Sequence, residues 1–536
     1  MRLFSVALLW VNAFGISNSE TVCDSLIVSL WPCVETFKIG PLPWMASARR
    51  EYVCRYLSKQ IEESQKHVIS YLNASIVESV SDLEVVIEPL WIQNVVLVNV
   101  VGFDEKSNAS SEMAEFVSDS DFRGFRNSVV RQFLDGIMSS LLHFPGVLDV
   151  EYDRRLSGIH ATSFDQFDRM DAGTKSYVGS NIRSLHAPEL WNLGVTGQNV
   201  TVASIDSGVR YSHETLRDTF RGKYDTARKK YDLDYAFWVP KGTPEEQLDP
   251  ENADLVGHGT HTMGTAVGRF GIGVAPNASW ITARAFDIYG TVRKSDFLTA
   301  TQWIVCPTKL DGTEPNCHLG ADIVTNSFGI SRDDAAFKDW VWFGNVLDVW
   351  KAAGVIAVFA SGNTNGFQCG SVLFPASTHE TIAVGALVGS KTLWGASGKG
   401  PGDKEHCSQQ QLIKPDFVAP GVGIRSAIST SDDAFTRLSG TSMATPHVAG
   451  SIALMLSLIR SHPSSTYDSQ GIIIVLKNTS AQTFSRPFLV RTKCGNISYR
   501  HYPNNIYGWG MPNVCNAANM LGGNCSLEIL AVKSLQ

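Results

Sequence analysis

The sequence predicts an α/β fold, a parallel sheet with helices on both faces, preceded by a small α+β unit. From about residue 186 onward, short apolar strands alternate with helical segments, which is the pattern of such a sheet. Before that point, residues 85–155 contain strands and a helix of their own. The polar stretch 153–184 between the two is typical of an exposed linker. A chain of 536 residues has room for this two-part organisation.

Composition and charge narrow the class of protein. The chain is 44% apolar and 18% charged, as in ordinary globular proteins, and its formal net charge is −7. Because nucleic-acid binding needs a concentrated basic surface, we expect no nucleic-acid partner. Beyond the N-terminal segment no run reaches about 18 consecutive apolar residues, so we expect no membrane anchor.

The N-terminal segment 1–19 resembles a secretory signal peptide. Arg2 precedes an apolar run, Leu3–Trp10, and small residues follow up to Ser19. Ten cysteines, an even number, suit an oxidising compartment. Seven Asn-X-Ser/Thr sites agree with that route, at Asn73, Asn108, Asn199, Asn277, Asn478, Asn496 and Asn524. We therefore expect a glycoprotein with disulfide bonds that is secreted or held in a secretory-pathway compartment.

Short-range periodicities define the small α+β unit. The run WIQNVVLVNVVGF, residues 91–103, is rich in β-branched residues and predicts a strand. Apolar residues at helical spacing predict a helix through Val130, Phe133, Leu134, Ile137 and Leu141. In GVLDVEYD, Leu148, Val150 and Tyr152 alternate with acidic residues, which predicts a half-buried strand. Residues 20–80 show no clear pattern.

Three predicted strands of the main unit end in polar side chains. NVTVASID, ADIVTNSFG and GVIAVFASGN place Asp206, Asn326 and Asn363 at their ends. A polar residue that ends an apolar strand is by itself only a turn former. Because the carboxyl ends of parallel strands meet at one edge of the sheet, three such residues together indicate a functional site there.

Two further motifs add a histidine and a serine. His258 lies between glycines in GHGTHTMGT, and Ser442 lies in GTSMATPHVAG, ahead of a helix predicted from about Ser442 to Leu458. We expect Pro446 in the first turn of that helix, since proline disrupts a helix interior. A metal site made of His258 and His261 is excluded, because the spacing is i, i+3 and no third ligand accompanies the pair.

These residue types together fit the chemistry of a serine nucleophile. Such a site needs a serine, a histidine that accepts its proton, and a carboxylate that orients the histidine. It also needs donors for the developing oxyanion, and the Asn363 amide and the Ser442 backbone N–H can supply them. The order Asp206, His258, Ser442 is one of the known chain orders of this triad.

The motifs SIDSGV, GHGTHTMGT, ASGN and GTSMATPHVAG resemble those of the subtilisin-like serine proteases, or subtilases. The resemblance covers about residues 186–520, and stretches such as HAPELWNLGVTGQNV and NNIYGWGMPNVCNA are similar to the bacillopeptidase F-like branch. It implies a subtilisin-like three-layer fold and a serine endopeptidase that hydrolyses protein or peptide substrates through an acyl-enzyme. It implies Asp206 as the orienting carboxylate and His258 as the base. Ser442 would be the nucleophile and Asn363 the oxyanion donor.

The same resemblance implies a zymogen whose propeptide acts as its inhibitor. The implied parts are a signal peptide, a propeptide, a linker with the maturation region, a peptidase domain and a tail, at 1–19, 20–160, 161–185, 186–525 and 526–536. The maturation cut is expected between about 153 and 184. His261 and His447 match structural positions of the family.

For the substrate, the resemblance implies an added strand between Ser327, Phe328, Gly329 and the segment near Ile288, Tyr289, Gly290. The pocket would be lined by the first of these segments and by Ala360, Ser361 and Gly362, which are small and neutral. Asp333 and Asp334 are either surface charges or a bias toward basic substrates. No cofactor is expected for catalysis. No EF-hand loop is present, and a structural calcium site built from scattered loops stays open.

Disulfide connectivity cannot be derived from a sequence. Nearness in sequence favours three pairs, Cys306–Cys317, Cys369–Cys407 and Cys494–Cys515. Three cysteines before residue 60 would then remain together with Cys525, so a bridge from the propeptide to the mature chain stays open.

Two other functions compete with a peptidase. An inactive homologue of the same fold would bind or inhibit other proteins, but all four chemical positions hold the required residue types. A lipase or esterase of the α/β-hydrolase type needs Gly-X-Ser-X-Gly and the order Ser, Asp, His. Here Ala444 stands two residues after Ser442 and the order is reversed, so that class is excluded.

Overall fold

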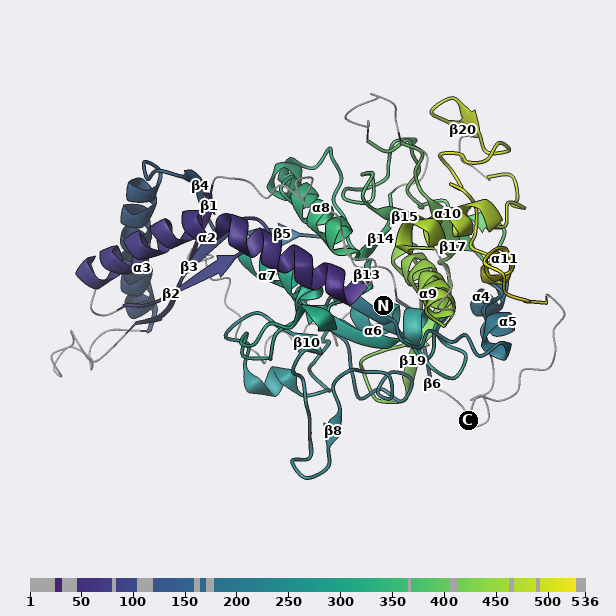
Figure 1. The fold of residues 1–536 in the computed structure, drawn as a ribbon, viewed down its shortest axis with the longest axis horizontal. Helices are drawn as coiled ribbons and strands as arrows, with labels where there is room; N and C mark the ends of the chain where they lie inside the picture. Colours follow the sequence, from purple (N-terminus) through teal and green to yellow (C-terminus); the bar gives the residue numbers. More distant parts are fainter. Residues whose placement is uncertain are drawn as a thin grey trace, which may run out of the picture. The chain divides into compact units, whose positions relative to one another are not determined.

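A computed structural model of the chain describes residues 25–30, 46–79, 83–103, 119–158, 164–169, 178–364, 368–403, 412–461, 467–487 and 492–526. The chain divides into two compact units. The N-terminal unit comprises residues 1–34 and 59–154, and the main unit residues 35–58 and 155–536. The long helix α2, Ala46–Ser79, contributes to both (Figure 1). The predicted signal peptide and nearly all of the predicted tail lie outside the described residues.

The N-terminal unit is an antiparallel sheet covered by helices. Its strands are β1 Ser25–Leu30, β2 Leu83–Leu90, β3 Val95–Phe103 and β4 Val147–Tyr152, in the order β2-β3-β1-β4. Alternate residues such as Leu26 and Val28 of β1 pack with Leu72 of α2 and Leu134 of α3, Asp119–Leu141. This confirms the predicted α+β unit, although the strand predicted at 91–103 begins only at Val95, after a turn; the predicted helix is α3, which ends at Leu141.

Two details of this unit differ from the sequence prediction. In β4, Val150 is buried but Leu148 is 47% exposed, so the expected alternation holds only in part. Residues 20–80, which show no pattern, contain β1 and α2. Helix α2 has no acidic residue in its first turn and no basic residue in its last, so the usual charge signals of helix ends are missing.

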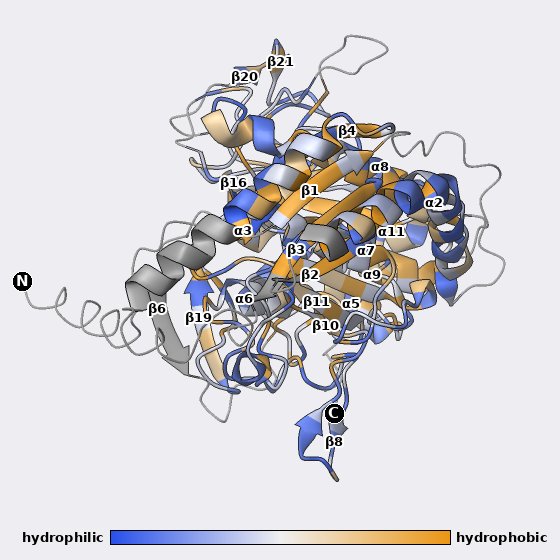
Figure 2. Ribbon diagram, turned by 90° about the vertical axis from the view of Figure 1, so that its left-hand side faces the viewer, coloured by the Kyte–Doolittle hydropathy of each residue, from blue (hydrophilic) through white to orange (hydrophobic). Residues whose placement is uncertain are grey.

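The main unit is built on a larger and mostly parallel sheet. Its order is β10-β11-β7-β13-β14-β15-β16, with β17 also paired to β15. The strands are β7 Thr201–Asp206, β10 Phe237–Trp238, β11 Ser279–Arg284, β13 Ile323–Asn326, β14 Ile356–Ala360, β15 Ile382–Val388, β16 Thr392–Leu393 and β17 Phe417–Pro420. Only the β15–β16 pair is antiparallel among these described neighbours. Figure 2 shows that apolar residues concentrate in the sheet strands.

Helices cover both faces of this sheet. They are α6 His258–Val267, α7 Lys294–Val305, α8 Phe343–Ala353 and α9 Thr441–Arg460. In β14, Val358 joins the apolar cluster that contains Ile452 of α9, whereas the next residue, Phe359, meets Phe343 of α8 edge-on. Since successive strand residues point to opposite faces, α8 and α9 lie on opposite sides. The predicted three-layer arrangement is confirmed.

Helix α9 runs through the centre of the main unit. Its length and apolar composition are sufficient to cross a membrane, but nearly all of its residues are buried inside the fold. The apolar surface of α9 therefore packs against protein: it contacts α6 and the strands β13, β14, β15 and β17.

Smaller elements surround this core. Strand β5, Arg155–Ser157, pairs with β12, Thr291–Arg293, and a separate sheet has the order β18-β19-β6. The latter strands are β18 Ile424–Ala427, β19 Ala434–Leu438 and β6 Phe164–Arg169. The remaining elements are α4 Ser180–Ser184, α5 Ala187–Asn192, α10 Ser469–Thr479, α11 Val514–Met520, η2 Glu245–Leu248, η3 Cys317–Leu319, η4 Ala335–Trp340, β8 Tyr224–Asp225, β9 Lys230–Tyr231, β20 Lys493–Cys494 and β21 Ile497–Ser498.

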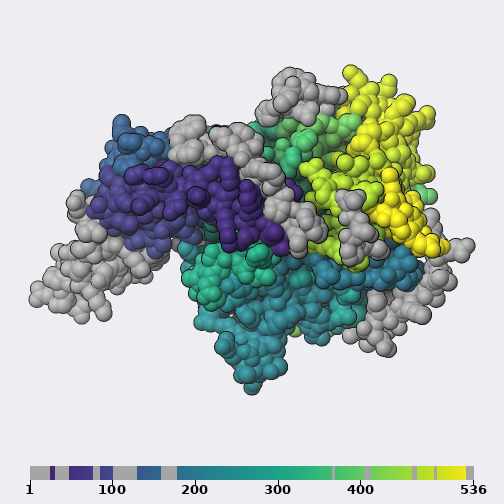
Figure 3. All heavy atoms as spheres, viewed as in Figure 1, coloured from purple at the N-terminus to yellow at the C-terminus, as the bar shows by residue number. Residues whose placement is uncertain are grey.

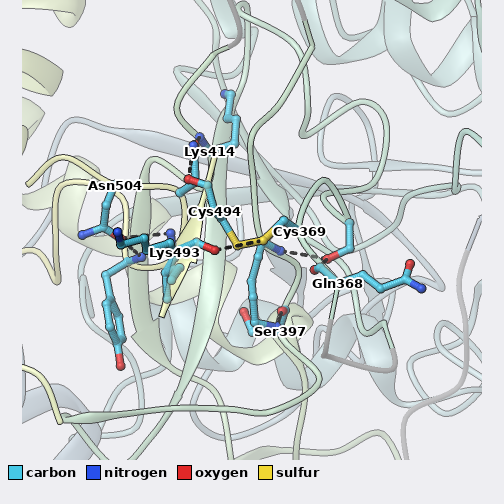
Figure 4. Close-up of a disulfide and its surroundings, with 12 residues drawn as sticks. Gln368, Cys369, Ser397, Lys414, Lys493, Cys494 and Asn504 are labelled. Atoms are coloured by element: carbon cyan, nitrogen blue, oxygen red, sulfur yellow. Dashed lines mark hydrogen bonds between the residues drawn. A yellow bond between two sulfur atoms is a disulfide. The ribbon is translucent and has the colours of Figure 1, made fainter. Parts of the chain in front are cut away.

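Three disulfides lie in the main unit, and two of the predicted pairs are wrong. The observed pairs are Cys306–Cys317, as expected, Cys369–Cys494 (Figure 4) and Cys515–Cys525. Nearness in sequence fails here because β20 folds back onto the loop that carries Cys369. Cys54 is a free and buried thiol, and Cys407 lies outside the described residues.

The bridges Cys306–Cys317 and Cys369–Cys494 close loops of very different length, and we predict that they stabilise the fold by different amounts. Cys369–Cys494 spans 125 residues and Cys306–Cys317 spans 11. Because a longer loop loses more entropy when it is closed in the unfolded chain, replacing both cysteines of the long bridge by serine should lower the free energy of unfolding by about 2 kcal/mol more than the same change at the short one. Urea unfolding of both double variants, made in a Ser442→Ala chain that lacks the nucleophile expected from the sequence, checks this. Equal losses would contradict it.

Candidate active site

The three predicted triad residues lie where elements end or begin at one edge of the main sheet. Asp206 is the last residue of β7, His258 the first residue of α6, and Ser442 the second residue of α9. All three are buried. Asn326, which ends β13, is also buried. Its amide nitrogen donates to the carbonyls of Val324 and Val358 within the sheet.

The structure brings Asp206 and His258 together. Nδ1 of His258 lies 2.7 Å from Oδ1 of Asp206, which also accepts the backbone N–H of Ser207 at 2.7 Å. Burial lowers the pKa of His258, but the charge of Asp206 and its hydrogen bond raise it, and the net pKa lies above the ordinary value. A carboxylate held in this way fixes the ring and its tautomer, with a proton on Nδ1.

A second carboxylate, Asp254, organises the loops around this pair. Its Oδ1 accepts from the Ser207 hydroxyl at 2.9 Å and from Gly257 N–H at 2.8 Å, and its Oδ2 accepts from Thr260 N–H at 2.8 Å. It thus satisfies amides at the start of α6, which would otherwise lack partners. Sequence analysis missed this residue. The available signal was an acidic residue four positions before His258, close to the place of a helix cap.

Gly208, after Asp206 and Ser207, permits the close approach of the loop before α6. Its φ is +100°, and a Cβ there would lie 1.9 Å from the Ala253 carbonyl oxygen. Any other residue would push apart the loops that carry Asp206 and Asp254, so the glycine of the Asp-Ser-Gly motif is required by geometry.

The start of α9 holds Ser442. The helix spans Thr441–Arg460, and Pro446 is its sixth residue rather than a first-turn residue as predicted. Pro446 has no N–H for the carbonyl of Ser442, four residues earlier. That carbonyl accepts the Ser327 hydroxyl at 3.1 Å instead, and this explains why the proline is tolerated there.

The serine and histidine are not hydrogen-bonded to each other in this structure. Oγ of Ser442 donates to the Ser327 carbonyl at 3.3 Å. Nε2 of His258 is buried and has no hydrogen-bond partner within the described part of the chain. A buried ring nitrogen with unused capacity is what a proton acceptor for a neighbouring hydroxyl requires, and such contacts often tighten only when substrate binds.

Asn363 is fixed by the residue before the serine. Its Oδ1 accepts Thr441 N–H at 2.9 Å and the Thr441 hydroxyl at 2.8 Å. Since the amide oxygen faces these donors, the amide nitrogen points away from Thr441. Asn363 and Ser442 line the same pocket.

The other two histidines of the motifs are held neutral by burial. Burial lowers the pKa of His261 to about 3 and that of His447 to about 4. Each ring bonds a backbone carbonyl, of Ile424 at 2.9 Å and of Met443 at 2.8 Å, respectively. These contacts agree with the structural roles that the family resemblance implies.

The pocket beside Ser442 contains most of the predicted lining residues. Ser327, Phe328, Gly329, Ala360 and Gly362 line it, and so do Gly158, Ser331, Asp334, Leu373, Thr364, Asn363 and Thr441. Ser361 does not appear in the lining, and Tyr289 is 68% exposed. Of the two acidic residues left open, Asp334 lines the pocket, where its carboxylate also accepts Ala336 N–H at 2.9 Å.

A segment of the chain itself lies in the predicted substrate groove. Gly158, after β5, donates its N–H to the Gly290 carbonyl at 3.2 Å and accepts Gly329 N–H at 3.1 Å. Strand β5 pairs antiparallel with Thr291–Arg293, one step beyond the segment predicted from the sequence. Leu156 of β5 is buried. The groove thus binds extended chain by backbone hydrogen bonds on both sides.

Among the described residues, the groups of side chains close enough to share a metal ion reduce to Cys54, Cys306 and Cys317. Two of these are joined in a disulfide, and calcium prefers oxygen ligands. This cluster is therefore not the calcium site that the sequence left open.

Comparisons with known proteins agree with this geometry. The family model described as Subtilase family matches residues 197–510. Bacillopeptidase F of Bacillus subtilis (strain 168) is 30% identical over 409 residues, 72% of this chain, although the chain spans only 25% of that protein. Subtilisin E of the same strain is 31% identical over 346 residues, 64% of this chain and 71% of its own length. The chain belongs to the subtilase family of serine peptidases.

Proposed function

We propose that this chain is a secreted serine endopeptidase made as a zymogen. The observation that carries the catalytic part is the buried Asp206–His258 hydrogen bond of 2.7 Å, together with the unused Nε2 of the same ring. With the start of α9 beside it, this pair supplies a base for the Ser442 hydroxyl. The reaction uses protein groups alone, so the proposal includes no cofactor.

In the proposed mechanism Ser442 Oγ attacks the carbonyl carbon of the scissile peptide bond while its proton passes to Nε2 of His258. Asp206 holds the imidazolium that forms. The amide nitrogen of Asn363 and the backbone N–H of Ser442 donate to the oxyanion. His258 then returns the proton to the leaving amine. In the second half of the reaction, His258 takes a proton from water, the water attacks the acyl carbonyl, and Ser442 leaves with the proton from His258.

The zymogen part rests on two segments that flank one short interval. Residues up to Gly158 lie in the groove on one side of Ser442. Strand β6, which begins at Phe164, pairs with β19, whose last residue Leu438 stands shortly before Ser442. Because the chain enters and leaves the catalytic region as a strand on each side, we propose that the first cut falls between Gly158 and Phe164. The residues before the cut would be the propeptide.

Secretion is supported by the N-terminal segment and the disulfides. Residues 1–19 have the pattern of a signal peptide, and three bridges occur among the described residues. The Asn-X-Ser/Thr sites would carry glycans along this route. Protein or peptide substrates and the chain's own propeptide are the proposed partners.

Labelling and turnover should depend on Ser442 and Asn363. A fluorophosphonate probe should modify the mature protein and fail with Ser442→Ala, whereas an inactive homologue would not be labelled at all.

Asn363→Asp keeps the acceptor for Thr441 but loses the donor, so kcat should fall by about 10²–10³, the range found when such a donor is removed from a subtilisin. Full kcat in Asn363→Asp with a peptide substrate would rule out the oxyanion role.

The pH dependence should follow the raised pKa of His258. The base works only when neutral, so kcat should fall as the pH drops through a pKa above the ordinary value of about 6.5. In Asp206→Asn the stabilising charge is lost, and the acid limb of the residual activity should move to lower pH. Asp311→Asn, which removes a carboxylate from an exposed loop, is the control and should leave the profile unchanged. A limb that moves to higher pH in Asp206→Asn would contradict the assignment.

Maturation should depend on the fit of the groove strand. A Cβ at Gly158 would come within 3.0 Å of Phe286 and 3.3 Å of Trp340, so Gly158→Val should slow self-cleavage by about tenfold or more. Ser157→Ala, at an exposed position of the same strand, should cleave normally. N-terminal sequencing of the mature chain should begin between residues 159 and 164, and a start at residue 20 would exclude the zymogen.

A further inference from the structure

The first part of α2, residues 46–58, belongs to the main unit although it lies in the chain between the two parts of the N-terminal unit. We call this segment the clip. Its buried side chains, Arg50, Val53, Cys54 and Leu57, recur at helical spacing along one face. In the space-filling view the purple start of α2 lies directly on the surface of the main unit (Figure 3). The clip therefore has its own binding surface there.

Arg50 is the centre of this contact. Its side chain is 4% exposed, and its guanidinium donates to the carbonyls of Cys317 and Ala321, both at 3.1 Å, and to Oδ1 of Asp322 at 3.2 Å. The carbonyl of His318 accepts a fourth bond at 3.4 Å. A buried guanidinium is stable only when paired and hydrogen-bonded, and here nearly all of its donors are used.

The surface that receives Arg50 is built for a cation. Asp322 also holds Arg460 through two bonds of 2.8 Å and accepts Thr201 N–H at 2.9 Å. Burial raises the pKa of Asp322, but Arg460 and Arg50 lower it more, so the carboxylate stays charged. All four acceptors for Arg50 come from the segment 317–322, directly before β13.

Arg49 binds a second group of acceptors next to the first. Its Nε donates to the Ala352 carbonyl at 2.6 Å and its Nη2 to the Lys351 carbonyl at 3.2 Å. These are carbonyls of the last turn of α8, where the regular helical hydrogen bonds end, and the Lys351 carbonyl also accepts the Gly354 N–H at 3.1 Å. A cation at a helix C-terminus is also favoured by the helix dipole.

The clip site lies at the opposite edge of the sheet from the catalytic residues. Asp322 precedes β13 at its amino end, whereas Asp206 ends the parallel neighbour β7 at its carboxyl end. The residues that the clip contacts are therefore different from those that line the groove.

We propose that the clip is a docking element for this rear edge of the sheet, independent of the substrate groove, and that it keeps the N-terminal chain attached after the chain is cut. The second half of the statement rests on the proposed function. A cut between Gly158 and Phe164 frees the groove strand at one end, but the clip holds the same chain close to the enzyme. The inhibitory segment then rebinds at a high effective concentration, which can raise apparent affinity by about 10²–10⁴-fold.

The test uses the full chain after self-cleavage. Size-exclusion chromatography followed by denaturing mass spectrometry should find both chains together, also after the groove is blocked with a covalent peptidyl inhibitor. In Arg49→Ala/Arg50→Ala the N-terminal chain should separate, and its apparent inhibition constant should rise by about 10²–10⁴-fold. Arg55→Ala, on the same helix but with a side chain that is 80% exposed, should behave as wild type. Equal separation in wild type and the double variant would overturn the proposal.

Alkylation of Cys54 measures the docking of the clip without any enzyme activity. It therefore distinguishes a failure of the docking proposal from a failure of the proposed function. Cys54 is buried in the clip within 4.8 Å of the Cys306 and Cys317 sulfurs. In uncleaved Ser442→Ala protein, alkylation of the Cys54 peptide should be slow. Arg50→Lys keeps the positive charge but loses the planar guanidinium with its several N–H donors. The alkylation rate of Cys54 should then rise by at least about tenfold, since hydrogen bonds to a charged group are lost. An unchanged rate in the folded variant would refute the docking even if the enzyme is active.

Discussion

The buried hydrogen bond between Asp206 and His258 is the interaction on which the rest of the site depends. It joins the end of a central strand to the first residue of a helix, so its geometry is set by how β7 and α6 pack. Asp254 stabilises that packing by bonding both the Ser207 hydroxyl and the amides at the start of α6. A carboxylate with five donors around it is rigid, and rigidity of the loops keeps the 2.7 Å contact in place.

The catalytic region is bordered by strand edges that the chain fills with its own segments. On one side β5 adds to β12, and on the other β6 adds to β19. Exposed strand edges bind any extended chain that can supply matching backbone groups. The groove that would hold a peptide substrate therefore holds the segment just before the proposed cut, and the edge of β19 holds the segment just after it.

Within the main unit, the clip is held by the charged side chains of Arg49 and Arg50, and β5 is held by backbone pairing. Arg49 and Arg50 donate to carbonyl groups at the end of α8 and before β13. Such contacts are specific because a guanidinium needs several acceptors in a fixed plane. They give the start of α2, which carries no clear sequence signature, a fixed set of partners in the main unit.

The sequence by itself determined the fold class, the four motif residues Asp206, His258, Asn363 and Ser442 and the motif order. These depend on short-range spacing, where a strand end, a glycine turn and a helix start can be recognised from neighbouring letters. Only the tertiary structure decided the partner of Cys369, the role of Asp254, the position of Pro446 in the second turn and the burial of Arg50. Each of these depends on a contact between segments far apart in the chain, and local patterns carry no information about which distant groups satisfy one another.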